Sequence, residues 1–153
     1  MINYRLAEKS DIASLVRLRA EFIGLDKSHE TFEKVYESIK QYFEDKILTK
    51  ECVTILAVDK NSIIGTGIVF FYDSVPSLSN ISGKNVYITS MYVKEEYRRM
   101  KIGSTILEKL IEISKDNHAQ FIMLNATEIG KELYNQYGFK DIENGMILKV
   151  YFN

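Results

Sequence analysis

The chain has 153 residues, which suits one domain spanning 1–153 and allows a substantial buried core. Hydrophobic residues make up 46% and charged residues 27%, proportions typical of a soluble globular protein, and the net charge of −1 argues against general nucleic-acid binding. No apolar run is long enough to cross a bilayer, the first residues lack a signal-peptide core, and a single cysteine cannot form an internal disulfide. We therefore expect a cytoplasmic protein without membrane or nucleic-acid partners.

The first part of the chain predicts one strand and two helices. Residues 2–6 alternate apolar and polar side chains, as a strand does. A helix is predicted over 12–23, with Ser10 and Asp11 as candidate caps at its start. Its inward stripe comprises Ile12, Leu15, Val16 and Phe22. Apolar residues at helical spacing predict a second helix over 30–48.

A β-hairpin is predicted next. The runs 53–58 and 63–72 are rich in β-branched and aromatic residues and are separated by a short polar turn. Gly65 and Gly67 lie inside the second run, where glycine indicates a bulge or the close approach of another element. The polar stretch 73–84, which contains the only proline, predicts a surface loop.

The middle of the chain reads as a strand, a basic turn and a helix. Residues 85–93 are β-rich, and a strongly periodic helix runs to about residue 114. The turn between them carries the cations Arg98, Arg99 and Lys101. Unpaired amides at a helix start can bind phosphate, and Gly103 leaves the backbone open to a ligand. A solvated basic loop is the simpler interpretation of the turn alone, and the flanking elements favour the phosphate site.

Two strands and a helix are predicted in the last part. Residues 120–125 contain a short apolar run, Phe-Ile-Met-Leu, which is expected to form a strand parallel to the preceding strand across the helix. Thr127 can cap a helix that begins near Glu128 and stops at Gly138. Its expected inward stripe comprises Ile129, Leu133 and Tyr137. A final strand is predicted over 146–152.

Two segments carry a family resemblance. The run 93–107 resembles motif A of the GCN5-related N-acetyltransferase (GNAT) family, Arg/Gln-x-x-Gly-x-Gly/Ala. Arg98 fits its first position and Gly103 its last, while Lys101 replaces the first glycine. Residues 133–139 resemble the family's Leu-Tyr-x-x-x-Gly-Phe segment, and the order of predicted elements agrees over nearly the whole chain.

The resemblance implies a fold and a reaction. The fold is α/β, with a mixed, mostly antiparallel sheet of about seven strands, about four flanking helices, and a parallel splayed pair at strands four and five. The reaction is transfer of an acetyl group from acetyl-CoA, as cosubstrate and without a metal, to a primary amine of a small molecule or peptide by direct attack. A non-catalytic acyl-CoA-binding sensor or interaction module is the alternative, and a nucleotide-binding regulator is a second one. Monomer and homodimer both remain open.

The resemblance also assigns site residues. Tyr134 is the expected general acid for the leaving thiolate. The backbones of Met91 and Val93 are expected to pair with the pantetheine arm, and an N–H of Met91 or Tyr92 to polarise the thioester carbonyl. The full set of expected cofactor contacts is Met91, Tyr92, Val93, Arg98, Arg99, Met100, Lys101, Ile102, Gly103, Ser104, Asn125, Thr127, Gly130 and Tyr134.

The general base and the acceptor stay open at this point. Thr89 and Ser90 stand where some family members place an acid, and neither is a competent base, so a water held by them or by Tyr92 is the favoured interpretation. Asp26 and Glu30 are candidate contacts for a cationic amine.

Overall fold

The structure is a computed structural model that describes residues 1–151. Its elements in chain order are β1 (Asn3–Leu6), the short 3-10 helix η1 (Lys9–Asp11), α1 (Ile12–Phe22), α2 (Phe32–Lys46), β2 (Cys52–Asp59), β3 (Ser62–Asp73), β4 (Lys84–Val93), the 3-10 helix η2 (Glu95–Tyr97), α3 (Ile102–Asp116), β5 (Phe121–Leu124) and α4 (Glu128–Gln136). Within residues 1–151, no helix has both the length and the apolar character needed to span a membrane.

The strands form one sheet in the order β1-β2-β3-β4-β5. Neighbours from β1 to β4 are antiparallel, and β4 pairs in parallel with β5 after the crossover through α3. The turn between β2 and β3 holds Lys60 and Asn61 at positive φ angles of 45° and 69°, as a tight hairpin connection requires. The predicted hairpin and the predicted parallel pair are therefore confirmed.

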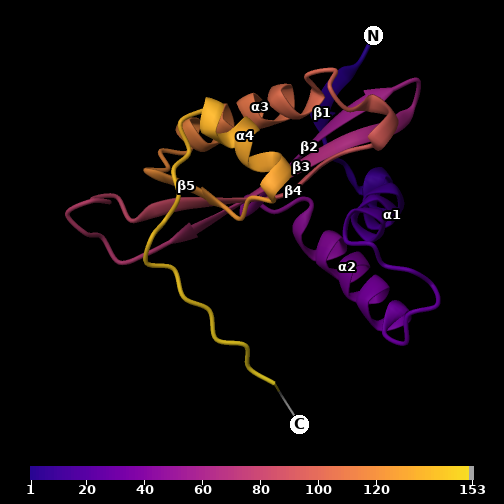
Figure 1. The fold of residues 1–153 in the computed structure, drawn as a ribbon, viewed down its shortest axis with the longest axis horizontal. Helices are drawn as coiled ribbons and strands as arrows, with labels where there is room; N and C mark the ends of the chain where they lie inside the picture. The colour runs from indigo at the N-terminus through magenta and orange to yellow at the C-terminus, as the bar shows by residue number, and fades with distance from the viewer. Residues whose placement is uncertain (152–153) are drawn as a thin grey trace.

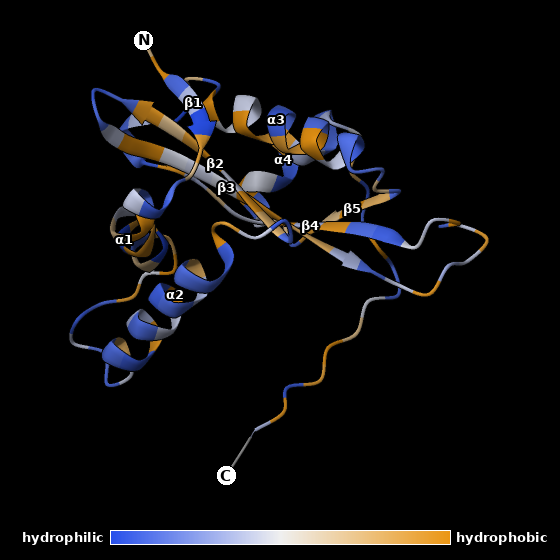
Figure 2. Cartoon of the chain, turned by 180° about the vertical axis from the view of Figure 1, so that it is seen from behind, coloured by the Kyte–Doolittle hydropathy of each residue, from blue (hydrophilic) through white to orange (hydrophobic). Residues whose placement is uncertain are grey.

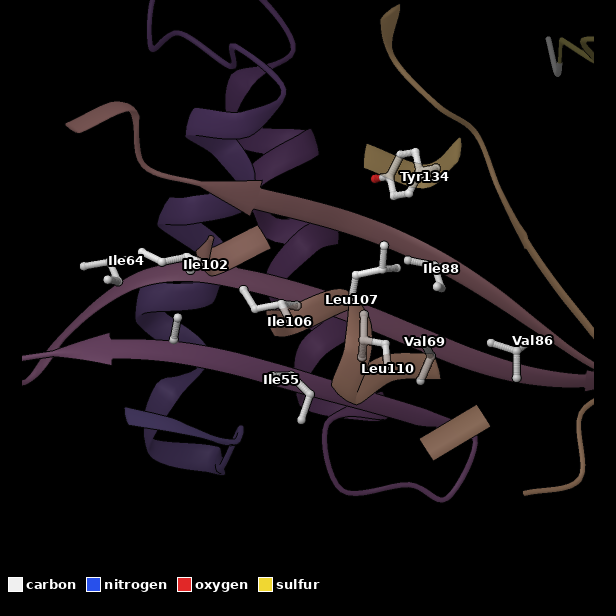
Figure 3. Packing of buried hydrophobic residues seen from close by; sticks show 11 residues of the cluster. Ile55, Ile64, Val69, Val86, Ile88, Ile102, Ile106, Leu107, Leu110 and Tyr134 are labelled. Carbon is white, nitrogen blue, oxygen red and sulfur yellow. The ribbon is translucent and has the colours of Figure 1, made fainter. Parts of the chain in front are cut away.

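Helices cover both faces of the sheet (Figure 1). On one face, α3 buries four aliphatic side chains against the strands, and Tyr134 of α4 joins the same cluster (Figure 3). The four residues of α3 are Ile102, Ile106, Leu107 and Leu110. On the other face, Leu15 and Leu18 of α1 and Phe43 of α2 pack against Leu56 and Ile68 of the sheet. The sheet thus presents two separate buried faces, and both β2 and β3 contribute buried side chains to each of them.

The expected number of strands is wrong. The described residues form five strands rather than about seven, and the predicted final strand is absent over 146–151, while Phe152 lies outside the described residues. Met146, Ile147 and Leu148 are 100%, 88% and 85% exposed, and Figures 1 and 2 show this segment leading away from the sheet. An apolar, β-branched and aromatic run is not sufficient here, because a strand also needs a partner for its backbone hydrogen bonds.

The buried face of α4 also differs from the prediction. Ile129 was expected to point inward and is 93% exposed. The inward residue is Tyr134, with Leu133 and Tyr137 partly buried beside it. The buried stripe begins only in the second turn, since residues 127–129 at the start of α4 are exposed.

Asp11 has a role other than the predicted cap of α1. Its carboxylate accepts two hydrogen bonds from Arg5, at 2.7 and 2.8 Å, and one from the backbone N–H of Glu8 at 2.8 Å. The hydrogen bonds from Arg5 hold the pKa of Asp11 below its usual value. This ion pair ties β1 to the start of α1.

Helix α3 crosses β3 at the positions of two glycines. A Cβ atom on Gly67 would lie 2.6 Å from Cγ2 of Ile106 and 2.8 Å from Cδ1 of Leu110. A Cβ on Gly65 would lie 3.2 Å from Cδ1 of Ile106. The close approach that the glycines predicted is confirmed, and it sets how near the start of α3 lies to β4.

We expect Gly67→Ala to lower the free energy of unfolding by about 1–3 kcal/mol, because the new methyl group overpacks the contact with α3. Urea denaturation measures the change. Gly145→Ala is the control, since a Cβ there meets nothing within 4 Å, and it should stay within about 0.5 kcal/mol of the wild type. A Gly67→Ala protein as stable as the control would contradict the close packing.

Candidate active site

One edge of β4 is open along its second half. The last pair between β4 and β5 joins Ile88 to Leu124, while β4 continues to Val93. The N–H of Lys94 donates to the carbonyl of Ile64 on β3 at 2.9 Å, so the backbone of Val93, one residue earlier, faces the opposite edge. An unpaired strand edge of this kind offers donors and acceptors to an extended ligand.

A β-bulge interrupts β4 within this open half. Gly67 of β3 faces two residues of β4, Ser90 and Met91, and Ser90 has a left-handed φ of 51°. Met91 packs in the cluster under α3, whereas Ser90 and Tyr92 lie on the face covered by α1. The bulge therefore sends neighbouring residues of one strand to two different faces.

The start of α3 has free amide groups. No side chain caps this helix, and its first backbone hydrogen bond is donated by Thr105 to the carbonyl of Lys101 at 3.0 Å. The N–H groups of Ile102, Gly103 and Ser104 have no acceptor among residues 1–151. A Cβ on Gly103 would meet its nearest neighbour at 3.7 Å, so internal packing does not require glycine there. These amides can receive an anion.

The basic turn keeps the backbone conformation that glycine favours. Lys101, which replaces the glycine of the family motif, has φ 61° and ψ 12°, and Arg99 has φ 62°. Arg98, Arg99 and Lys101 are exposed, and no carboxylate among residues 1–151 lies within 4.0 Å of them. The Nε of Arg98 donates to the carbonyl of Val93 at 3.4 Å, which holds the turn beside the open edge of β4.

Tyr134 lies on the same face of the sheet as α3. Its side chain is 9% exposed, and its ring packs edge-on to Phe139 with centroids 5.8 Å apart. A Cβ on Gly130 would lie 3.1 Å from Cε2 of Tyr134, so Gly130 makes room for the ring. The hydroxyl has no hydrogen-bond partner among residues 1–151, and burial raises the pKa of the phenol above its usual value. A neutral, unpaired phenol is thus available as a proton donor.

The other expected contacts lie between β5 and α4. Thr127 caps α4 as predicted, because its Oγ1 accepts the N–H of Gly130 at 3.2 Å. Asn125 and Thr127 are exposed directly after the last residue of β5. Nothing in the fold contradicts their assignment as cofactor contacts, which stays a prediction.

On the opposite face, α1 supplies two charged residues that were not identified from the sequence. Nη1 of Arg19 donates to Oγ of Ser90 at 3.2 Å, and the hydroxyl of Tyr92 donates to the carboxylate of Glu21. Burial and the bond to Glu21 raise the pKa of Tyr92 to about 12. A signal for Arg19 exists in the sequence, since it falls on the inward stripe of α1, four residues after Leu15.

The two acidic residues proposed as amine contacts lie elsewhere. Asp26 and Glu30 are exposed in the loop between α1 and α2, and Asp26 accepts hydrogen bonds from the backbone and hydroxyl of Ser28. Within residues 1–151, no hydrogen bond or ion pair joins either carboxylate to β4. Glu21 is instead the described carboxylate that reaches the strand.

The sequence resembles known acetyltransferases. The sequence model of the Acetyltransferase (GNAT) family matches residues 16–139. Thialysine N-epsilon-acetyltransferase of Bos taurus is 32% identical over 83 residues, which are 52% of this chain and 46% of the bovine protein. The chain thus matches about half the length of that relative. The Mus musculus protein of the same name is 24% identical over 141 residues, 88% of this chain and 80% of the mouse protein.

Solved structures share the fold. A predicted acetyltransferase from Clostridium acetobutylicum, solved with acetyl-CoA, superposes with a TM-score of 0.87 at 30% identity, covering 97% of this chain and 96% of the other. A GCN5-related N-acetyltransferase from Ralstonia eutropha has a TM-score of 0.84 at 17% identity, covering 97% and 99%, and so shows the fold alone. With its motif A turn, its parted β4 and β5, and a family match over residues 16–139, the chain belongs to the GNAT acetyltransferase family.

Proposed function

We propose that the protein transfers the acetyl group of acetyl-CoA to a primary amine on a small molecule or peptide. One observation carries the proposal: the free amides at the start of α3 follow a turn that is held at the open edge of β4. The contact that holds it is the hydrogen bond from Arg98 to the carbonyl of Val93. The unpaired phenol of Tyr134 lies on the same face of the sheet as α3. Acetyl-CoA needs an anion site for its diphosphate, a strand edge for its pantetheine arm and a proton donor for its leaving thiolate.

Acetyl-CoA binds along these three sites, with a different part of the molecule at each. Its diphosphate accepts hydrogen bonds from the amides of residues 102–104, and the exposed cations of the turn add charge-assisted contacts. The two amides of the pantetheine arm pair with the backbone of Val93 and Met91 as an added strand. The family membership and the acetyl-CoA in the C. acetobutylicum structure support this placement.

The chemistry takes place at the bulge. The N–H of Met91 or Tyr92 polarises the thioester carbonyl, and the neutral amine attacks its carbon. The tetrahedral intermediate collapses with cleavage of the carbon–sulfur bond. A thiol with a pKa of about 8.5 leaves as thiolate, and the phenol of Tyr134 donates the proton to it. The raised pKa of Tyr134 keeps this proton on the phenol until the thiolate forms.

The amine must first lose a proton, since its own pKa is near ~10.4. Neither Thr89 nor Ser90 can take it. A water held by Ser90 and Tyr92 can pass the proton toward Glu21, whose carboxylate accepts the Tyr92 hydroxyl. This places proton removal on the α1 face and proton donation on the α3 face of the same strand.

A direct test measures acetylated product by mass spectrometry with acetyl-CoA and a panel of primary amines. We expect free CoA and N-acetylated product in equal amounts. Stabilisation by acetyl-CoA without any product would contradict the enzyme and favour a cofactor-binding module.

We expect Tyr134→Phe to lower turnover about 100-fold and to leave the acetyl-CoA Kd within about twofold, since the ring remains and only the proton donor is lost. Stopped-flow or steady-state release of CoA, with isothermal titration for binding, measures the two effects. Tyr137→Phe is the matched control. Its hydroxyl already donates to Glu108 at 2.6 Å and has no assigned part in the reaction, so turnover should be retained. Equal turnover in both variants would remove Tyr134 from the reaction.

A further inference from the structure

A small hollow lies on the α1 side of β4, on the opposite face of the sheet from α3. Its polar lining comes from Arg19 of α1, Thr66 of β3, and Ser90 and Tyr92 of β4, and the ring of Phe22 forms one wall. The two β4 residues flank Met91, the bulge position assigned above to the thioester carbonyl. The hollow therefore borders the place where the acceptor amine must arrive.

Arg19 is a cation without a counter-ion in this hollow. It is partly buried, because it occupies the inward stripe of α1, and its guanidinium lies 5.3 Å from the ring centroid of Phe22. No carboxylate among residues 1–151 comes within 4.0 Å of it. Its hydrogen bond to Ser90 uses one of the five N–H donors of a guanidinium. Desolvation lowers the pKa of Arg19, which means that burial destabilises the charged guanidinium. A bound anion would offset this destabilisation.

A second polar group in the hollow also lacks a partner. Thr66 is 4% exposed, and its Oγ1 is buried without any hydrogen bond among residues 1–151. Buried hydroxyl groups are nearly always hydrogen-bonded, so the unpartnered hydroxyl of Thr66 near Arg19 is free to bond a polar group that enters the hollow. The hydroxyl can donate to an anionic oxygen, as the guanidinium does.

We propose that Arg19, with Thr66 and Ser90, binds a carboxylate of the acetyl acceptor, so that the acceptor is an amine that also carries a carboxylate, as an amino acid does. This inference rests on the proposed acetyl transfer and adds the substrate class. A carboxylate suits the site because it matches the planar guanidinium fork in shape and in charge, with one negative charge for one cation. Amines with no anionic group meet only the repulsion of Arg19 at this position.

The opposite charges on α1 fit such a zwitterionic acceptor. Arg19 and Glu21 both reach β4 from α1, one through Ser90 and the other through Tyr92. The carboxylate then lies at Arg19, and the ammonium group can approach Glu21 and the bulge. Recognition by two opposite charges also fixes the orientation of the acceptor before attack.

The test compares amines that differ only in the carboxylate: lysine with cadaverine, and ornithine with putrescine. We expect wild-type kcat/KM to favour the carboxylate-bearing amine of each pair by about 10- to 100-fold, the range that a charged hydrogen-bonded pair contributes. Arg19→Met should abolish this preference by lowering kcat/KM for the amino acid alone. Arg19→Lys, which keeps the charge but not the fork, should restore part of it.

Arg17→Met is the matched control, because Arg17 lies exposed on the same helix and bonds only to Ser14 at 3.1 Å. It should keep the wild-type preference. Equal or better acetylation of the decarboxylated amines by the wild type would overturn the inference and leave the proposed function standing, and so would preference for an amine that carries a phosphate. A wild type that acetylates no amine at all would overturn both.

Discussion

The contact between α3 and the glycine positions of β3 fixes the distance from helix to sheet. Because Gly67 has no side chain, Ile106 and Leu110 settle directly on β3, and Met91 packs beside them. The bulge at Ser90 faces the same glycine. The position of the free amides at the start of α3 relative to the open edge of β4 therefore depends on this packing, and so does the proposed placement of acetyl-CoA.

β4 contributes residues to both faces of the sheet, and the two faces differ in the charged groups that they present. On the α3 face, the free amides and exposed cations can bind a diphosphate, and the neutral phenol of Tyr134 can donate a proton. On the α1 face, Arg19 and Glu21 reach the same strand through Ser90 and Tyr92. Because the bulge directs Met91 to one side and its two neighbours to the other, cofactor and acceptor can approach the same peptide from opposite directions.

Much of the fold could be predicted from the sequence, because the helices, strands and turns are specified by patterns among residues that are close together in the chain. Helical spacing identified α3, and the Asp59 to Ser62 turn identified the hairpin. The family resemblance singled out Tyr134 and the basic turn, and their roles in the site stay predictions. The rest depends on tertiary context. The tail at 146–151 has a strand-like composition but no partner strand, Ile129 lies in the exposed first turn of α4, and the left-handed Lys101 follows from the turn rather than from its own preference. Arg19 falls on the inward stripe of α1, but the contacts of Arg19 with Ser90 and of Glu21 with Tyr92 became visible only once α1 was placed against β4, since no pattern links residues about seventy positions apart.

The most direct measurement is a crystal structure of the protein grown with acetyl-CoA. We expect the diphosphate oxygens about 3 Å from the N–H groups of Ile102, Gly103 and Ser104, and the pantetheine arm bonded along the open edge of β4. The sulfur should then lie beside the hydroxyl of Tyr134. A cofactor bound away from the start of α3, or an edge of β4 left without ligand contacts, would contradict the central claim.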